Sequence, residues 1–246
     1  MISNSEGRRE EGIGEAIILA GGLGTRLRSA VPDLPKCMAP VNGKPFIGYV
    51  IDYFLSQDVR KFILSLGYKS EAIIGYIKSD YPDLHVQFAI EDEPLGTGGA
   101  IRLSCELATE KNVFVTNGDT LFNVNLSEIL NKHVKSNSDC TLSLKPMVDF
   151  DRYGVVELED DCTVSSFKEK QYYEKGLING GLYVLNVAHF LNESLPQKFS
   201  FEKEYMETLF LKRRMSGVIQ EGYFIDIGIP QDYLKAQHDF THKIQG

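Results

Sequence analysis

The segment from Leu19 to Leu27 has a composition that suits the binding of a phosphate group. It reads Leu-Ala-Gly-Gly-Leu-Gly-Thr-Arg-Leu, so an apolar run passes directly into three glycines and then an arginine. Glycines let the backbone approach a ligand closely and turn its N–H groups toward an anion. A glycine-rich segment alone is equally compatible with a plain tight turn. Lys36, which follows Pro35 ten residues after Arg26, adds a second cation and favours a phosphate-binding loop.

Two common phosphate-binding motifs do not account for this loop. The P-loop pattern G-x-x-x-x-G-K-[ST] is absent from the chain. The dinucleotide pattern G-x-G-x-x-G fails because Leu27 stands where the third glycine is required. The loop therefore belongs to another class of phosphate site.

Two aspartates follow apolar segments and are placed to bind a cation. Asp119 comes shortly after the apolar run Val113–Thr116. A carboxylate at the carboxyl end of a central strand suits a metal ion, although Asp119 alone is equally compatible with a helix cap or a turn. Asp226 is the only acid in the apolar stretch 223–230, where a charge needs a partner or an ion.

Short apolar runs alternate with amphipathic stretches through the first half of the chain, and this alternation indicates the fold class. The order strand, helix, strand predicts a mostly parallel α/β sheet with helices on both faces and right-handed crossovers. The second half has strand-like runs with fewer clear helices between them. The predicted strands are 16–20, 61–66, 86–90, 113–116, 140–144, 154–158 and 181–185, and the predicted helices are 45–55, 71–77, 99–107, 201–211 and 230–242.

Charge and cysteine content argue against several classes of protein. A net charge of -8 is a poor match to non-specific binding of nucleic acid. The 4 cysteines are widely spaced, which argues against a zinc site or a disulfide framework and suits a reducing cytoplasm. The longest apolar runs fall far short of the roughly 20 residues that span a bilayer. We therefore expect a cytoplasmic protein that binds neither nucleic acid nor membrane.

The loop from Leu19 to Leu27, followed by Pro35-Lys36, resembles the defining loop of the sugar-1-phosphate nucleotidyltransferases. The resemblance implies a Rossmann-like fold of the nucleotide-diphospho-sugar transferase type. It also implies that Arg26 and Lys36 are the catalytic residues and grip a triphosphate. Cys37 replaces a proline common in the family, so it is either a thiol near the active site or a buried and inert residue. The implied nucleotide contacts in this loop are Leu19, Ala20, Gly21, Gly22, Gly24 and Thr25.

The metal expected from the resemblance is Mg²⁺, bound by Asp119 and Asp226. A divalent ion held by two carboxylates neutralises two anionic substrates that must meet. No general base is needed, because a sugar phosphate is already mostly ionised near neutral pH, with a second pKa of about 6. Catalysis is then positioning and electrostatic stabilisation of an in-line attack.

The segment Glu91–Ala100 resembles the base-recognition loop of the family, in the form found with manno-type sugars. Glu91 falls where thymidylyl and uridylyl members often carry glutamine. A carboxylate only accepts hydrogen bonds, and guanine presents two adjacent donors, so Glu91, or its neighbour Glu93, favours GTP. The residues expected to contact the nucleotide here are Glu91, Pro94, Gly96 and Thr97.

Three later segments, 153–156, 167–170 and 179–183, match the family in order and imply a sugar 1-phosphate site. In these segments a carboxylate suits sugar hydroxyls and an ammonium suits phosphate, which are the roles implied for Glu169 and Lys170. Gln171 replaces a proline common after Lys170, so the resemblance does not fix the pose of this loop. The expected sugar-phosphate residues are Asn117, Gly118, Gly154, Glu169, Lys170, Asn179 and Gly180.

The domain organisation expected from these matches is simple. Residues 1–14 are a polar extension, expected to be disordered and not a secretory signal. Residues 15–246 form a single nucleotidyltransferase domain. It comprises a nucleotide-binding half at about 15–125, a sugar-binding half at about 126–230, and a C-terminal helix to the end.

The subgroup most similar in its motifs is that of the D-glycero-α-D-manno-heptose 1-phosphate guanylyltransferases, which supply GDP-heptose for bacterial surface polysaccharides. The expected partners are therefore GTP and a sugar 1-phosphate, and family members are often dimers or tetramers. One alternative is mannose 1-phosphate with GTP. Others are glucose or N-acetylmuramate 1-phosphate with a uridine or thymidine donor, and a catalytically inactive homologue that binds nucleotide.

Overall fold

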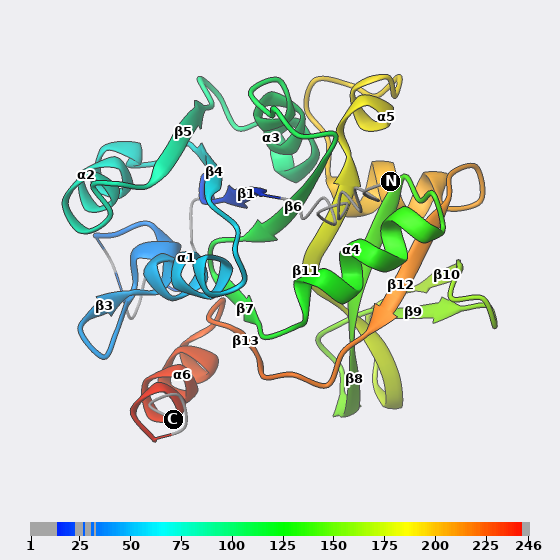
Figure 1. Ribbon diagram of the computed structural model, residues 1–246. Helices are drawn as coiled ribbons and strands as arrows, with labels where there is room; N and C mark the ends of the chain where they lie inside the picture. Colours follow the sequence, from blue (N-terminus) through cyan, green and yellow to red (C-terminus); the bar gives the residue numbers. More distant parts are fainter. Residues whose placement is uncertain (1–13, 23–26, 28–30, 32, 243–246) are drawn as a thin grey trace, which may run out of the picture.

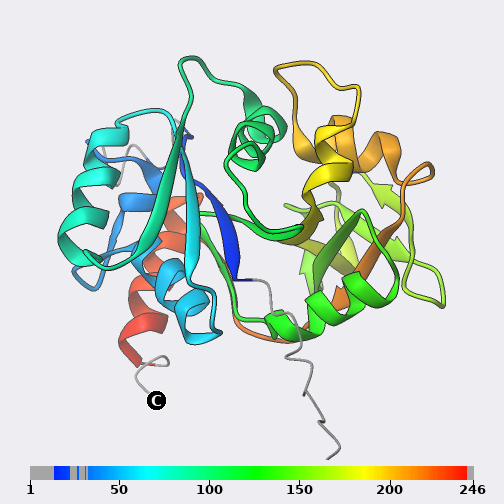
Figure 2. The same ribbon diagram turned by 45° about the horizontal axis from the view of Figure 1, so that its top comes forward.

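The computed structural model describes residues 14–22, 27, 31 and 33–242 of the 246-residue chain. The predicted extension at residues 1–14 lies outside this part except for Gly14. The described chain forms one large sheet flanked by helices, shown in two views in Figures 1 and 2.

The first half of the chain builds the parallel part of this sheet. Its strands are β1 (Glu15–Leu19), β4 (Lys61–Leu66), β5 (His85–Ile90) and β6 (Asn112–Asn117). β1 pairs in parallel with both β4 and β6, and β4 pairs in parallel with β5. The four strands therefore end at the same edge of the sheet, where ligands bind in open α/β folds.

The second half continues the same sheet, mostly with antiparallel strands. β11 (Tyr173–Asn186) lies antiparallel to β6, to β8 (Cys140–Phe150) and to β9 (Val155–Leu158). β10 (Val164–Lys168) is antiparallel to β9, and β12 (Met215–Ile219) is parallel to β8. The strand order is β10-β9-β11-β6-β1-β4-β5, with β8 beside β11 and β12 beside β8.

Helices cover both faces of the sheet, as predicted. Successive residues of a strand point to opposite faces. Ile18 of β1 packs in one core with Phe54 of α1 (Phe46–Ser56), whereas Ile17 packs in a second core with Ile101 of α3 (Gly96–Cys105). Figure 1 shows α1 and α3 on opposite sides of β1. The first core also includes α2 (Ser70–Asp80), α4 (Leu126–Lys135) and α6 (Pro230–His242), and the second includes α5 (Val187–Leu191) and the π-helix η3 (Phe201–Glu207).

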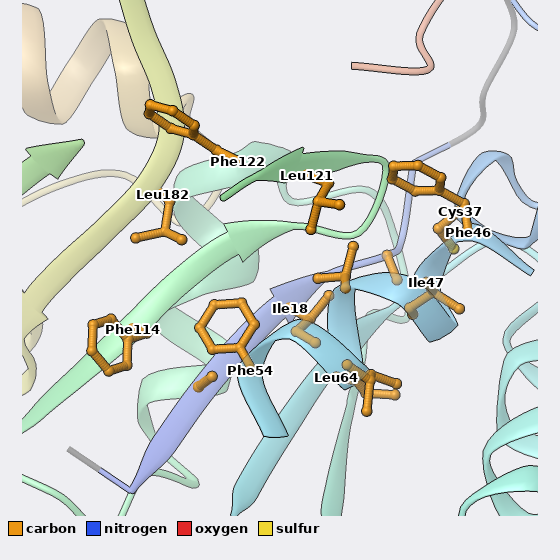
Figure 3. Close-up of a cluster of buried hydrophobic side chains, with 14 of the residues drawn as sticks. Ile18, Cys37, Phe46, Ile47, Phe54, Leu64, Phe114, Leu121, Phe122 and Leu182 are labelled. Carbon is orange, nitrogen blue, oxygen red and sulfur yellow. The ribbon is translucent and has the colours of Figure 1, made fainter. Parts of the chain in front are cut away.

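The first core is packed mainly with aromatic and aliphatic side chains. In Figure 3, Phe54 of α1 lies beside Ile18 and Phe114 of the sheet. The rings of Phe54 and Phe114 are 6.0 Å apart and tilted, and Phe54 has no exposed surface. Burying a side chain of this size stabilises the fold by about 1.5–3 kcal/mol. Among the described residues, no helix is long and apolar enough to cross a bilayer.

Two short ribbons lie at the carboxyl edge of the parallel strands. In the first, β7 (Thr120–Phe122) pairs antiparallel with β13 (Phe224–Asp226), and Thr120 is opposite Asp226. In the second, β2 (Pro40–Val41) pairs with β3 (Lys44–Pro45), shortly after the short 3₁₀ helix η2 (Lys36–Met38). Lys36 of η2, Asp119 directly before β7 and Asp226 of β13 lie together, although they are far apart in the sequence.

Candidate active site

A first cavity of about 560 Å³ opens at the carboxyl ends of β1, β4 and β5. It includes most of the residues predicted to contact a nucleotide. Ala20 lies just beneath, and its N–H donates to the carbonyl of Ser65 at 2.8 Å. Gly24, Thr25 and Arg26 lie outside the described residues. The residues predicted to contact the nucleotide that line the cavity are Leu19, Gly21, Gly22, Glu91, Pro94, Gly96 and Thr97, together with Glu93, the alternative named beside Glu91. The other lining residues are Ser65, Gly67, Tyr68, Asp92 and Ala100, which were not assigned to the nucleotide, and Asn117 and Asp119.

The floor of this cavity depends on two glycines at neighbouring strand ends. A Cβ atom on Gly21 would lie 3.1 Å from the backbone nitrogen of Gly67, and one on Gly67 would lie 3.0 Å from the carbonyl oxygen of Gly21. The turns after β1 and β4 therefore pass each other without side chains between them. This close passage leaves backbone N–H groups near the space that a phosphate could enter.

Glu91 lies on the wall of the first cavity and faces the glycine turn. Its Oε2 accepts a hydrogen bond from the backbone N–H of Leu95 at 3.2 Å, and a Cβ on Gly21 would lie 3.5 Å from its Oε1. Burial raises the pKa of the Glu91 carboxyl, and the hydrogen bond from Leu95 opposes this only in part. The side chain is thus fixed by one oxygen, while the other is directed to the cavity side of Gly21.

A second cavity of about 470 Å³ lies between β9, β11 and η3. It includes nearly all residues predicted to contact a sugar phosphate. Gly118 is the exception, because it lines neither cavity; its N–H donates to the carbonyl of Leu19 at 2.8 Å. The predicted residues that line the second cavity are Asn117, Gly154, Glu169, Lys170, Asn179 and Gly180.

Several lining residues of the second cavity were not singled out from the sequence. Ser200, Glu202, Lys203, Met206 and Glu207 come from η3 or from the residue before it. The segment was predicted as helical, but its charged residues form no motif that predicts a binding site. Lys203 pairs with Glu207 at 2.9 Å and with Glu169 at 3.4 Å.

The two cavities meet at a cluster of two carboxylates and one ammonium group. Asp119 lines the first cavity, Asp226 lines the second, and Asn117 lines both. Lys36 Nζ forms an ion pair with Asp119 Oδ2 and lies 3.3 Å from Asp226 Oδ1. The backbone N–H of Gly228 donates to Asp226 Oδ1 at 2.8 Å, which fixes this carboxylate on its turn.

The electrostatic state of the cluster follows from these contacts. Burial alone would lower the pKa of Lys36, but the charges of Asp119 and Asp226 outweigh it and raise the pKa above its ordinary value. The ammonium therefore stays protonated and occupies the space between two carboxylates that are each about a quarter exposed, at 25% and 24%.

The donor chemistry of this cluster suits a hard divalent cation. Carboxylate oxygens are the ligands that Mg²⁺ uses in proteins, usually one or two of them together with water and substrate phosphates. Within the described part of the chain no group of three or more His, Cys, Asp or Glu side chains is arranged to hold a metal ion. Asp119 and Asp226 thus fit an ion that takes its other ligands from substrate and water.

Cys37 lies directly behind the cluster. A Cβ on Gly118 would lie 3.3 Å from Cys37 Cβ, and the thiol is buried with 3% of the residue exposed. Burial and the nearby Asp119 raise the pKa of the Cys37 thiol to about 12. The residue is close to the site, but its thiol is protonated and packed in the core, which matches the inert alternative.

Several known proteins are similar to this chain over nearly their whole length. Residues 15–243 match the family model described as nucleotidyl transferase. The chain is 50% identical to a D-glycero-alpha-D-manno-heptose 1-phosphate guanylyltransferase of Aneurinibacillus thermoaerophilus, over 94% of this chain and 100% of the relative. A protein of the same name from Campylobacter jejuni is 44% identical over 89% of this chain and 96% of its own length. The crystal structure of HddC from Yersinia pseudotuberculosis complexed with GMP-PN superposes with a TM-score of 0.83 at 38% identity, covering 93% of this chain and 100% of HddC.

Proposed function

The chain belongs to the nucleotidyl transferase family, and from that premise we propose that it is a D-glycero-α-D-manno-heptose 1-phosphate guanylyltransferase. Such an enzyme transfers GMP from GTP to the sugar phosphate, forms GDP-heptose and releases pyrophosphate. The observation that carries the proposal is the meeting of two cavities at Asp119, Lys36 and Asp226. A reaction between two anions needs such a junction, where fixed charges neutralise both substrates.

The chemistry needs no protein nucleophile and no general base. An oxygen of the sugar phosphate attacks the α-phosphorus of GTP, and the bond from that phosphorus to the β-phosphate oxygen breaks. The attacking phosphate is already mostly ionised, since the second pKa of a phosphate monoester is about 6. The work of the protein is to align the two phosphates and to stabilise charge, as in phosphoryl transfer generally.

The cluster of Lys36, Asp119 and Asp226 supplies the charge stabilisation in this proposal. Asp119 and Asp226 would hold Mg²⁺, and the ion would supply positive charge against the phosphate oxygens. Lys36 binds the triphosphate from its buried position next to both carboxylates, and Arg26 binds the same group from the glycine loop. The backbone at Gly21 and Gly22 approaches the nucleotide, which the absence of side chains there permits.

Recognition of the two substrates falls to opposite walls of the site. Glu91 accepts hydrogen bonds from guanine, which presents two adjacent donors, N1–H and N2–H₂. The Oε2 of Glu91 already accepts from the N–H of Leu95, whereas its Oε1 faces the cavity and is open to the base. On the other side, Glu169 and Asn179 bind sugar hydroxyls and Lys170 binds the sugar phosphate. The four cysteines, all free thiols, support a cytoplasmic setting for this reaction.

The proposal is tested by measuring pyrophosphate release with MgCl₂ across a grid of substrates. The grid combines GTP, ATP, CTP, UTP and dTTP with the 1-phosphates of the manno-heptose, mannose, glucose and N-acetylmuramate. Turnover with GTP and the heptose phosphate well above all other pairs is the expected result. Higher turnover with mannose 1-phosphate would replace the sugar, and higher turnover with UTP or dTTP would overturn the assignment of guanine. Nucleotide binding without turnover for any pair would favour an inactive homologue.

A further inference from the structure

We propose that Glu202 binds a hydroxyl group of the sugar phosphate, and that Thr97, expected from the sequence to contact the nucleotide, is a positioning residue that holds Glu202. The inference rests on the proposed function, because it takes the second cavity as the sugar site. It adds a specificity residue from η3 to a pocket for which the sequence indicated residues at the end of β6, directly before β9, in the loop after β10 and on β11.

The start of α3 is built to receive the segment that leads into η3. A Cβ on Gly98 would lie 2.1 Å from the ring of Phe199, and one on Gly99 would lie 2.5 Å from the carbonyl oxygen of Gln197. The N–H of Gly98 donates to the carbonyl of Phe199 at 2.9 Å, and the N–H of Phe199 donates to the carbonyl of Leu95 at 3.0 Å. The glycines of the Leu-Gly-Thr-Gly-Gly run therefore make room for residues 197–199, which lead into η3 and the second cavity, and not only for a nucleotide.

The hydroxyl of Thr97 is committed to this contact. It donates to Glu202 Oε2 at 2.8 Å, and it accepts from the backbone N–H of Phe201 at 2.8 Å. A threonine hydroxyl has one hydrogen to donate, so Thr97 has none left for a nucleotide. Although Thr97 lines the first cavity, its hydroxyl group donates to Glu202, a residue of the second cavity.

Glu202 is held by one oxygen and has acceptor capacity on the other. Its Oε2 accepts from the hydroxyls of Thr97 and Ser200, the latter at 3.0 Å. Its Oε1 accepts no hydrogen bond from the described residues, and the half-buried side chain lines the second cavity. A carboxylate already immobilised by two hydroxyl donors loses little conformational entropy when a ligand hydroxyl donates to it.

The other glutamates of this wall differ from Glu202 in their partners. Glu169 and Glu207 both pair with the ammonium of Lys203, whereas Glu202 pairs with no cation among the described residues. Its partners are neutral hydroxyl donors, and a sugar supplies more donors of the same kind. The carboxylates of this wall thus divide into two that share the ammonium of Lys203 and one that is suited to hydroxyl groups.

The first test is steady-state kinetics of Glu202→Gln with the substrate pair that the wild type turns over. A hydrogen bond between a hydroxyl and a charged group contributes enough that its loss raises KM for the sugar 1-phosphate about tenfold or more, while KM for the nucleotide stays within about twofold. Glu204→Gln is the matched control, because Glu204 lies on the same π-helix but does not line the cavity. An unchanged sugar KM in Glu202→Gln would overturn the proposal.

The second test separates positioning from direct contact. Thr97→Val raises the sugar KM in the same direction, Thr97→Ser restores it, and the double variant with Glu202→Gln is no worse than Glu202→Gln alone. If Thr97→Val instead raised the nucleotide KM with the sugar KM unchanged, Thr97 would be a nucleotide contact and the proposal wrong. The proposed function is tested separately, by wild-type turnover across the substrate grid. The proposal on Glu202 and Thr97 is tested only by differences in KM between variants assayed with the same pair of substrates.

Discussion

Lys36 is the residue on which the two halves of the candidate site converge. Its ammonium lies between the carboxylates of Asp119 and Asp226 and takes the space that a divalent ion needs in order to use both. In the proposed reaction, a divalent ion and Lys36 would therefore compete for the same oxygens while no nucleotide is present. A triphosphate would supply the lysine with another anion, so the nucleotide would favour entry of the metal.

This competition gives a prediction for Lys36→Met in the nucleotide-free protein. Because removal of the ammonium frees both carboxylates, we expect the affinity for Mn²⁺, used as a probe for Mg²⁺, to rise about tenfold, or about 1.4 kcal/mol. Electron paramagnetic resonance of free Mn²⁺ measures this directly, without turnover. Lys44→Met is the control, since Lys44 pairs with Asp52 away from the site. Mn²⁺ affinity that fell or stayed constant would contradict the competition.

Glu91 gives a second prediction at the scale of one residue. A glutamine at this position presents a donor as well as an acceptor, so Glu91→Gln loses a charged acceptor for guanine and gains a partner for pyrimidines. We expect kcat/KM for GTP to fall about tenfold to a hundredfold, in line with a charged hydrogen bond, and the ratio of UTP to GTP to rise. Glu93→Gln, on the same cavity wall, tests the neighbour named with it. A fall shared equally by both nucleotides would show that Glu91 does not read the base.

At the scale of elements, sequence patterns identified the strands and helices with strong periodicity. The strands β1, β4, β5 and β6 were predicted to within one residue at every end. β1, β4 and β6 are mostly buried apolar runs, whereas β5 is an edge strand in which only Ala89 is buried. α4 was missed, although Asn125 caps it by accepting from the N–H of Glu128 at 3.1 Å. Its apolar face includes a histidine, which weakens the pattern. The ribbon of β7 and β13 has only three residues a strand, and its partners are about a hundred residues apart, so no local signal predicts it.

The same contrast holds for the candidate site. Asp119, Asp226 and Lys36 were identified because their motifs are local and resemble a family pattern. Glu202 was not, because its place in the cavity depends on how η3 packs on α3, which periodicity does not encode. Residues positioned by tertiary contact are thus the part of a site that a single sequence leaves open.

The missed helix α4 contains a buried histidine that makes stability depend on pH. His133 is 2% exposed; its Nδ1 lies 2.9 Å from Thr141 Oγ1 and its Nε2 lies 3.2 Å from Asn112 Oδ1. Burial lowers the pKa of His133 from 6.5 to about 4. Between these values the unfolded chain binds more protons than the folded one, so stability falls as the pH drops from 6.5 toward 4.

We therefore expect His133→Gln to lose part of this pH dependence. A shift of this size corresponds to about 3 kcal/mol over the full interval. Urea unfolding of the wild type and of the variant at several pH values between 7 and 4 measures the difference. His85→Gln is the control, because His85 is exposed at the start of β5. Parallel pH profiles for wild type and His133→Gln would show that protonation of His133 is not coupled to unfolding.

At the scale of the whole molecule, one continuous sheet carries both cavities, and the two carboxylates proposed to hold the metal come from distant parts of the chain. Asp119 follows β6 and Asp226 ends β13; the pairing of β7 with β13 and the hydrogen bond from the N–H of Ile227 to the carbonyl of Asp119 at 3.0 Å bring them together. In the proposed reaction, Mg²⁺ bound with GTP would therefore join the part of the fold that holds the nucleotide to the C-terminal strand that precedes α6. A ligand that binds only the folded chain stabilises it.

This architecture predicts a Mg²⁺-dependent stabilisation that needs Asp226. A ligand at 100 times its Kd adds about 2.7 kcal/mol, and each kcal/mol raises Tm by about 2–4 °C for a chain of this length. In the wild type, MgCl₂ added to a GTP-containing sample should raise Tm by several degrees, measured by thermal unfolding. In Asp226→Asn the increment from Mg²⁺ should vanish, while the increment from GTP alone remains. Asp160→Asn, an exposed aspartate outside both cavities, should behave as the wild type. Because each comparison is made within one variant, a change in basal stability from the lost Lys36 contact does not enter, and an undiminished Mg²⁺ increment in Asp226→Asn would remove this residue from the metal site.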